Sequence, residues 1–156
     1  MAEVRLTVDC AAVLGESPVW DEATKTLVFI DIMAKRVFSY DPRALTAASA
    51  LLPQLVGTVV PAAGGGLVAA LEDSVVGPFS LEGAPAAAAG PDSVVVTPAP
   101  GSVGAVSGEV PLVARWAGAA PGFRFNDGKV IMIGLITFHG NNDAMPPWNY
   151  QSAQRA

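Results

Sequence analysis

Short apolar segments separated by tight polar turns are the feature that most constrains the fold of this chain. Ser17–Trp20 leads into a polar turn at 21–25, and the apolar segments 26–32 and 36–40 follow with short connections. Segments of this length, rich in β-branched and aromatic residues, predict consecutive antiparallel strands. We expect Asp41-Pro42 to close this unit, because proline cannot donate to a continuing ladder.

The same pattern continues on both sides of this unit. Val4, Leu6 and Val8 alternate with polar residues and predict a first, half-buried strand. Residues 55–60 and 67–71 predict two more strands, joined by a tight turn at the glycines 64–66. The chain is therefore expected to be all-β. We expect Trp20, Phe29, Phe38 and Trp116 to lie in its core.

One segment departs from the strand pattern. From Gly83 to Gly108 the sequence consists largely of Ala, Pro, Gly, Ser and Val. Small side chains bury too little area to offset the entropy of ordering a chain, so a disordered insertion is predicted here. Residues 112–116 then resume a strand-like pattern.

Composition excludes several classes of function. The chain has 156 residues, a formal net charge of -5 and no run of Lys or Arg that could follow a phosphate backbone, so nucleic acid is not expected as a partner. The longest apolar stretch near the end, 130–138, is too short to cross a bilayer, which excludes a membrane partner of that kind. A single cysteine, Cys10, and a start without a signal-peptide pattern favour the cytoplasm.

Two short motifs carry the functional information. Gly15–Trp20 reads Gly-Glu-Ser-Pro-Val-Trp, and Arg124–Lys129 reads Arg-Phe-Asn-Asp-Gly-Lys. Together they resemble the gluconolactonase/regucalcin (senescence marker protein) family over about 4–81 and 115–130. The resemblance implies that Glu16 binds a divalent metal ion, calcium or zinc, and that Arg124 and Asn126 contact a sugar-lactone substrate.

The resemblance also implies a fold, a six-bladed β-propeller. Propeller blades have four strands and roughly 40 to 50 residues, so this chain provides about two to three of them. We expect an incomplete propeller in 1–130 and a divergent tail in 131–156, because Ile131–Leu135 replaces the Asp-Pro-x-Gly-Arg turn of the family. Open sheet edges are templates for pairing, so self-association is also expected.

Each motif also has a plainer interpretation. A single glutamate in a turn is most often a solvated surface residue. Arg124 and Asn126 alternate with Phe125, which on a strand turns both polar side chains to one face, but Asn126-Asp127-Gly128 is also a common hairpin turn. We expect Asp127 and Gly128 to shape such a turn. His139 is expected to be a loop residue, since neither it nor Cys10 has the spacing of a catalytic set.

The resemblance therefore implies a metal-dependent hydrolase of sugar lactones. In the family, the acid/base aspartate and a second metal ligand come from a later part of the sequence, and no position here matches them. The catalytic acid/base stays unassigned. The alternative is a non-catalytic, truncated product or a calcium-binding protein of the same family.

Overall fold

The computed structural model describes the backbone of residues 3–4, 6–82, 87–90, 93–95, 105–106, 111–115, 117, 124–131 and 135–140. Its side chains are described for 3–4, 6–81, 111–115, 117 and 124–126. Every regular element in this part of the chain is a strand, as predicted. The described part contains no helix with the length and apolar character that a bilayer-spanning segment needs.

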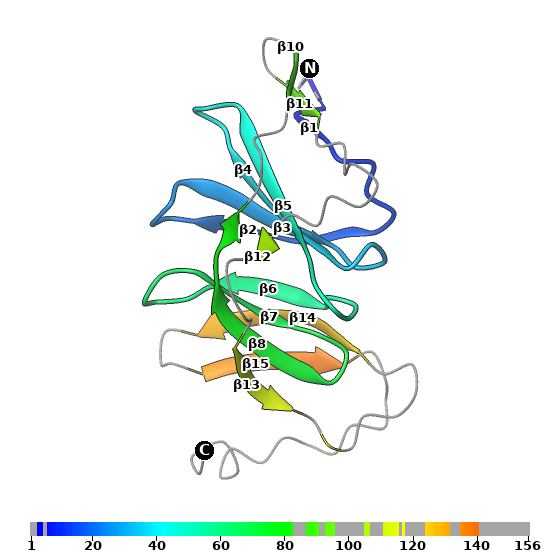
Figure 1. Ribbon diagram of the computed structural model, residues 1–156, viewed down its shortest axis with the longest axis vertical. Helices are drawn as coiled ribbons and strands as arrows, with labels where there is room; N and C mark the ends of the chain where they lie inside the picture. Colours follow the sequence, from blue (N-terminus) through cyan, green and yellow to red (C-terminus); the bar gives the residue numbers. More distant parts are fainter. Residues whose placement is uncertain are drawn as a thin grey trace.

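The first sheet is a four-stranded antiparallel meander with the order β2-β3-β4-β5 (Figure 1). Its strands are β2 (Gly15–Asp21), β3 (Thr26–Asp31), β4 (Arg36–Asp41) and β5 (Thr46–Leu51). The prediction that Asp41-Pro42 closes the unit was wrong. Pro42 lies in the turn after β4, where no ladder hydrogen bond is needed, and the alanine-rich β5 pairs along the whole length of β4.

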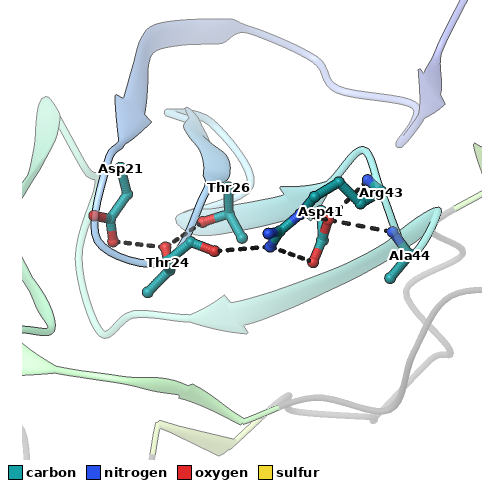
Figure 2. Close-up of polar contacts among 6 residues, drawn as sticks. All are labelled: Asp21, Thr24, Thr26, Asp41, Arg43 and Ala44. Carbon is teal, nitrogen blue, oxygen red and sulfur yellow. Dashed lines mark hydrogen bonds and ion pairs between the residues drawn. The ribbon is translucent and has the colours of Figure 1, made fainter.

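The connections of this sheet repeat every ten residues. Asp21, Asp31 and Asp41 end successive strands, and each accepts a hydrogen bond at Oδ1 from the backbone N–H two residues later. The last residue of each turn has a positive φ: these residues are Lys25, Lys35 and Leu45. Figure 2 shows two of these turns joined by Arg43, which donates both to Asp41 and to the carbonyl oxygen of Thr24. Aspartate is favoured at such positions because its short carboxylate replaces a backbone acceptor.

The second sheet has the order β13-β8-β7-β6. Its strands are β6 (Thr58–Pro61), β7 (Leu67–Ala70), β8 (Ser74–Phe79) and β13 (Leu112–Arg115). The tight turn predicted at the glycines is confirmed, with Gly65 and Gly66 at φ values of 92° and 78°. The outermost strand, β13, comes from the far side of the Ala/Pro/Gly-rich segment, so this segment interrupts a single blade between its third and fourth strands.

The Ala/Pro/Gly-rich segment was predicted to be disordered, but its described residues form three short strands. These are β10 (Ala87–Gly90), β11 (Ser93–Val95) and β12 (Ala105–Val106). β12 pairs with β9 (Leu81–Glu82), and β11 pairs with both β10 and β1 (Val8–Asp9). Backbone hydrogen bonds of this kind do not depend on side-chain size, which is why the composition did not reveal them. The other residues of the segment lie outside the described ones.

The first strand was predicted to span Val4 to Val8, and that prediction was wrong. Val4 and Leu6 are 94% and 69% exposed, and pairing begins only at Val8. Apolar and polar residues do alternate here, but no sheet in the described part of the chain lies beneath Val4 and Leu6 to bury their side chains.

The main core lies between the two four-stranded sheets. Its buried residues are Val28, Ile30, Ile32, Val37, Leu52, Val56, Val59, Leu67, Ala69, Leu71, Val76 and Phe79. On the opposite face of the first sheet, Phe29 and Phe38 stack with their ring centroids 4.9 Å apart. Trp20, also predicted to be core, is 45% exposed, and its indole N–H donates to Glu22. Trp116 lies outside the described residues.

A third unit follows the two sheets. β14 (Phe125–Ile131) and β15 (Leu135–Gly140) form an antiparallel hairpin that begins beside β6. Besides the small sheets of β1, β10 and β11 and of β9 and β12, the described part of the chain thus comprises two four-stranded blades and a two-stranded beginning of a third (Figure 1). The boundary expected at residue 130 falls within this hairpin.

Candidate functional site

Glu16 is the second residue of β2, a strand of the first sheet that contacts β6 of the second sheet. Its side chain is exposed. Glu16 pairs with Ile30, but the next pair along the strands is Val19 with Val28, so Ser17 and Pro18 together oppose one residue of β3. This is a β-bulge, a device that changes the direction of side chains along a strand.

The bulge decides which face Glu16 occupies. In a regular strand, residues three apart point to opposite faces, so Glu16 and Val19 would lie on different sides. With one extra residue between them, Glu16 shares the face of its pair partner Ile30 and of Val19, both of which belong to the core against the second sheet. Glu16 therefore lies at the rim of that core, on the side of β6.

A hydroxyl pair joins the start of β2 to the start of β6. Ser17 Oγ lies 2.9 Å from Thr58 Oγ1, within hydrogen-bonding distance. Thr58 is the first residue of β6 and is 1% exposed, so its hydroxyl is satisfied inside the protein. The sequence analysis did not identify Thr58, although its position directly after Gly57 at the start of a strand was visible.

The second motif lies at the start of β14. Phe125 is buried, while Arg124 and Asn126 are half-buried and meet each other, with Arg124 Nη1 donating to Asn126 Oδ1 at 2.7 Å. The predicted alternation of the three side chains is confirmed. Because a guanidinium has only donors, this contact fixes the amide so that its oxygen faces Arg124 and its NH₂ group points elsewhere.

The predicted turn at Asp127 and Gly128 was wrong. β14 continues through both residues to Ile131, and the pairing shifts between Asn126 and Gly128, which makes Asp127 the extra residue of a second bulge. His139 was expected in a loop but lies in β15, where its backbone is paired with Asn126. Side chains beyond Asn126 are outside the described ones.

Gly57 brings the two motifs to the same end of the molecule. A Cβ atom on Gly57 would lie 1.7 Å from the carbonyl oxygen of Phe125, so the two backbones approach more closely than any side chain permits. Phe125 N also donates to the carbonyl oxygen of Leu71, the residue directly after β7. The starts of β2, β6 and β14 therefore lie in a row, with Glu16 at one side and Arg124 and Asn126 at the other.

Glu16 fits one position in the ligand set of a divalent metal. It is an exposed carboxylate, the type of ligand that calcium and zinc both accept. Within the described residues there is no group of three or more His, Cys, Asp or Glu side chains close enough to hold a metal ion. Glu16 is thus not part of such a group, and the described part of the chain does not complete a catalytic zinc set of three protein ligands.

A different polar region lies at the opposite end of β2. Asp21 accepts a hydrogen bond from the Thr24 hydroxyl, and Thr24 meets Thr26 at 2.8 Å (Figure 2). These three residues line a cavity of about 250 Å³ between the first sheet and residues 66–67 and 79–81, at the ends of β7 and β8. The cavity contains none of the predicted site residues, and the hydrogen bonds of Asp21 are those of a turn.

Comparison with protein families agrees with the two motifs. The family model described as "SMP-30/Gluconolactonase/LRE-like region" matches residues 14–147, which includes both motifs and the whole β14–β15 hairpin. This match continues through the Ala/Pro/Gly-rich segment and beyond residue 130, further than the motifs themselves extend.

Individual relatives match over part of their length. Regucalcin from Xenopus laevis is 38% identical over 58 residues, which are 37% of this chain and 19% of regucalcin. The structure of a luciferin-regenerating enzyme superposes with a TM-score of 0.59 at 24% identity, covering 80% of this chain and 35% of that enzyme. The second comparison shows the fold, an incomplete propeller. The chain spans about a third of this solved relative's length.

Proposed function

Because the chain belongs to the SMP-30/gluconolactonase/LRE-like family, we propose that it is a metal-dependent hydrolase of sugar lactones. Glu16 is proposed as a ligand of the metal, calcium or zinc, and Arg124 and Asn126 as contacts to the substrate. The observation that carries this proposal is the row of strand starts, in which Ser17 meets Thr58 and the preceding residue, Gly57, meets Phe125.

The side chains at this edge suit a polyhydroxylated ring. Arg124 offers a planar fork of donors, and the NH₂ group of Asn126 offers two more on the side away from Arg124. Phe125 anchors both residues by packing in the core with Ala70 and Val75. Two polar side chains on one face, held by a buried ring between them, are placed to bind the hydroxyl groups of one small ligand.

A bound divalent metal would supply the polarisation of the lactone carbonyl that makes attack by water easier. Glu16 would hold the metal at the rim of the core, on the side of β6. We assign no acid/base residue. The activity, the metal and the lactone are all part of the proposal.

A non-catalytic member of the family is the second candidate. Glu16 is exposed and belongs to no group of three or more His, Cys, Asp or Glu side chains within the described residues, which fits weak metal binding better than the three-ligand set of a hydrolytic zinc site. This candidate retains metal binding at Glu16 and predicts no turnover.

Hydrolysis of gluconolactone by the purified chain distinguishes the two candidates. The assay uses added calcium or zinc, with and without chelator, and compares Glu16→Gln with the matched variant Glu22→Gln at the opposite end of β2. The hydrolase predicts turnover that is lost with chelator and with Glu16→Gln and kept with Glu22→Gln. Turnover that survives both treatments contradicts the role of Glu16, and metal binding without turnover supports the second candidate.

A further inference from the structure

Ser17 has a backbone conformation that needs support from its surroundings. Its φ is 53°, in the left-handed region that residues with a Cβ rarely adopt. Lys25, Lys35 and Leu45 also have positive φ, but each ends a tight turn, whereas Ser17 lies within a strand and precedes a proline. A strained residue inside a strand persists only where neighbouring contacts fix it.

Thr58 provides such a contact from the neighbouring sheet. Its hydroxyl lies 2.9 Å from that of Ser17, and its side chain is buried at the first position of β6. Since β6 is itself fixed by the close contact between Gly57 and Phe125, Thr58 is held on both sides. The rigid partner in this hydroxyl pair is Thr58, and the strained partner is Ser17.

The conformation of Ser17 determines where Glu16 points. Glu16 shares the face of Ile30 and Val19 only because the bulge at Ser17 and Pro18 adds one residue to β2. If β2 were regular from Gly15 to Val19, Glu16 would turn to the opposite face of the sheet, away from β6 and from Asn126.

We propose that Thr58 is a positioning residue for Glu16. Thr58 touches neither metal nor substrate in this account; its hydroxyl holds Ser17 in the bulge, and the bulge holds Glu16 toward the rim shared with Asn126. The consequence for metal binding rests on the proposed role of Glu16 as a ligand, whereas the positioning itself does not.

The test compares Thr58→Val, which removes the hydroxyl and keeps the shape, with Thr58→Ser, which keeps the hydroxyl. Thr26→Val is the matched control, because Thr26 also forms a hydroxyl pair, with Thr24, at the far end of β3. Calcium and zinc affinity is measured by titration calorimetry on the full chain. The ¹³Cα chemical shift of Ser17, which depends on φ, is measured without metal.

Thr58→Val is expected to change the Ser17 shift and to weaken metal binding about 10- to 100-fold, as loss of outer-shell partners does at other metal sites. Thr58→Ser and Thr26→Val are expected to leave both quantities unchanged. If Thr58→Val does not fold, Ser17→Ala at its half-buried position removes the same hydrogen bond and is expected to weaken metal binding to the same extent.

Two outcomes separate the proposals. If the wild-type chain binds neither metal, the metal role of Glu16 fails, and the ¹³Cα shift of Ser17 alone decides the positioning role of Thr58. If this shift is the same in Thr58→Val as in the wild type, the positioning role is overturned, whatever the metal affinity.

Discussion

The hydroxyl of Ser17, in the first sheet, lies 2.9 Å from the hydroxyl of Thr58, in the second. The residue before Thr58, Gly57, meets the backbone of Phe125 at the start of the third unit. Residues from three distant parts of the sequence thus meet at one end of the molecule. The motifs that contain Glu16 and Asn126 are brought together by β6, a strand that belongs to neither motif.

Replacing Gly57 by alanine tests this arrangement. The new Cβ would lie 1.7 Å from the carbonyl oxygen of Phe125, and backbone cannot yield as a flexible side chain does. We expect Gly57→Ala to lower the free energy of unfolding by about 3 kcal/mol, at the upper end of overpacking costs. Urea denaturation measures the change. Gly64→Ala is the control, because no atom lies within 4 Å of its added Cβ, and a comparable loss there would contradict the explanation.

Two aromatic residues of the first sheet are expected to differ strongly in their contribution to stability. Phe38 is 1% exposed and stacks on Phe29, so Phe38→Ala should lower the free energy of unfolding by about 3–5 kcal/mol. Trp20 is 45% exposed, and Trp20→Ala should cost about 1 kcal/mol or less. Thermal or urea denaturation of both variants provides the comparison. Equal losses would mean that Trp20 is packed as the sequence alone suggested.

Asn126 is predicted to act in substrate binding through its NH₂ group, because its oxygen is occupied by Arg124. Asn126→Asp keeps an acceptor for Arg124 and replaces the NH₂ group with oxygen. If the chain hydrolyses gluconolactone, Asn126→Asp and Asn126→Ala should both raise KM about tenfold, in line with about 1.4 kcal/mol of lost binding. Steady-state kinetics measure this effect, and a wild-type KM in Asn126→Asp would exclude the NH₂ group from binding.

The turn at Asp41 makes stability depend on acid pH. The side-chain hydrogen bonds from Arg43, followed by those from the backbone N–H groups of Arg43 and Ala44, hold the pKa of Asp41 below its ordinary value of 3.8. Because this pKa is lowered, the stabilisation of the folded state by the Asp41 carboxylate is complete above the unfolded-state pKa. It is lost as pH falls through the folded-state pKa. Urea midpoints measured from pH 6 to pH 2 should therefore fall less steeply below about pH 4 in Asp41→Asn than in the wild type. If the urea midpoints of the two proteins fall in parallel with pH, Asp41 does not contribute to the pH dependence of stability.

The strands of the first sheet could be predicted because their apolar residues and turns are local signals. The same holds for the alternation of Arg124, Phe125 and Asn126. The ten-residue recurrence of Asp21, Asp31 and Asp41 is also visible in the sequence and would have predicted β5, since a third aspartate turn implies another strand after it.

The remaining features depend on contacts between distant residues. The bulge at Ser17 reverses the face of Glu16, and no local pattern indicates it because Ser-Pro also fits a regular edge strand. Trp20 is exposed because the face of the sheet beneath it is only partly covered, which composition cannot show. The pairing of Thr58 with Ser17 requires two blades to be packed together, and only the structure provides that.

Paramagnetic broadening by Mn²⁺ tests most directly the claim that Glu16 and Asn126 share one metal-binding rim. Manganese prefers oxygen ligands, as calcium does, and it broadens NMR signals of nearby nuclei. Titration into the ¹⁵N-labelled chain is predicted to broaden the amide signals of Glu16 and Ser17 together with the side-chain NH₂ of Asn126, to leave Ala44 sharp, and to have no such effect in Glu16→Gln. Broadening centred on Asp21 and Asp41, or at Glu16 without Asn126, would contradict the account.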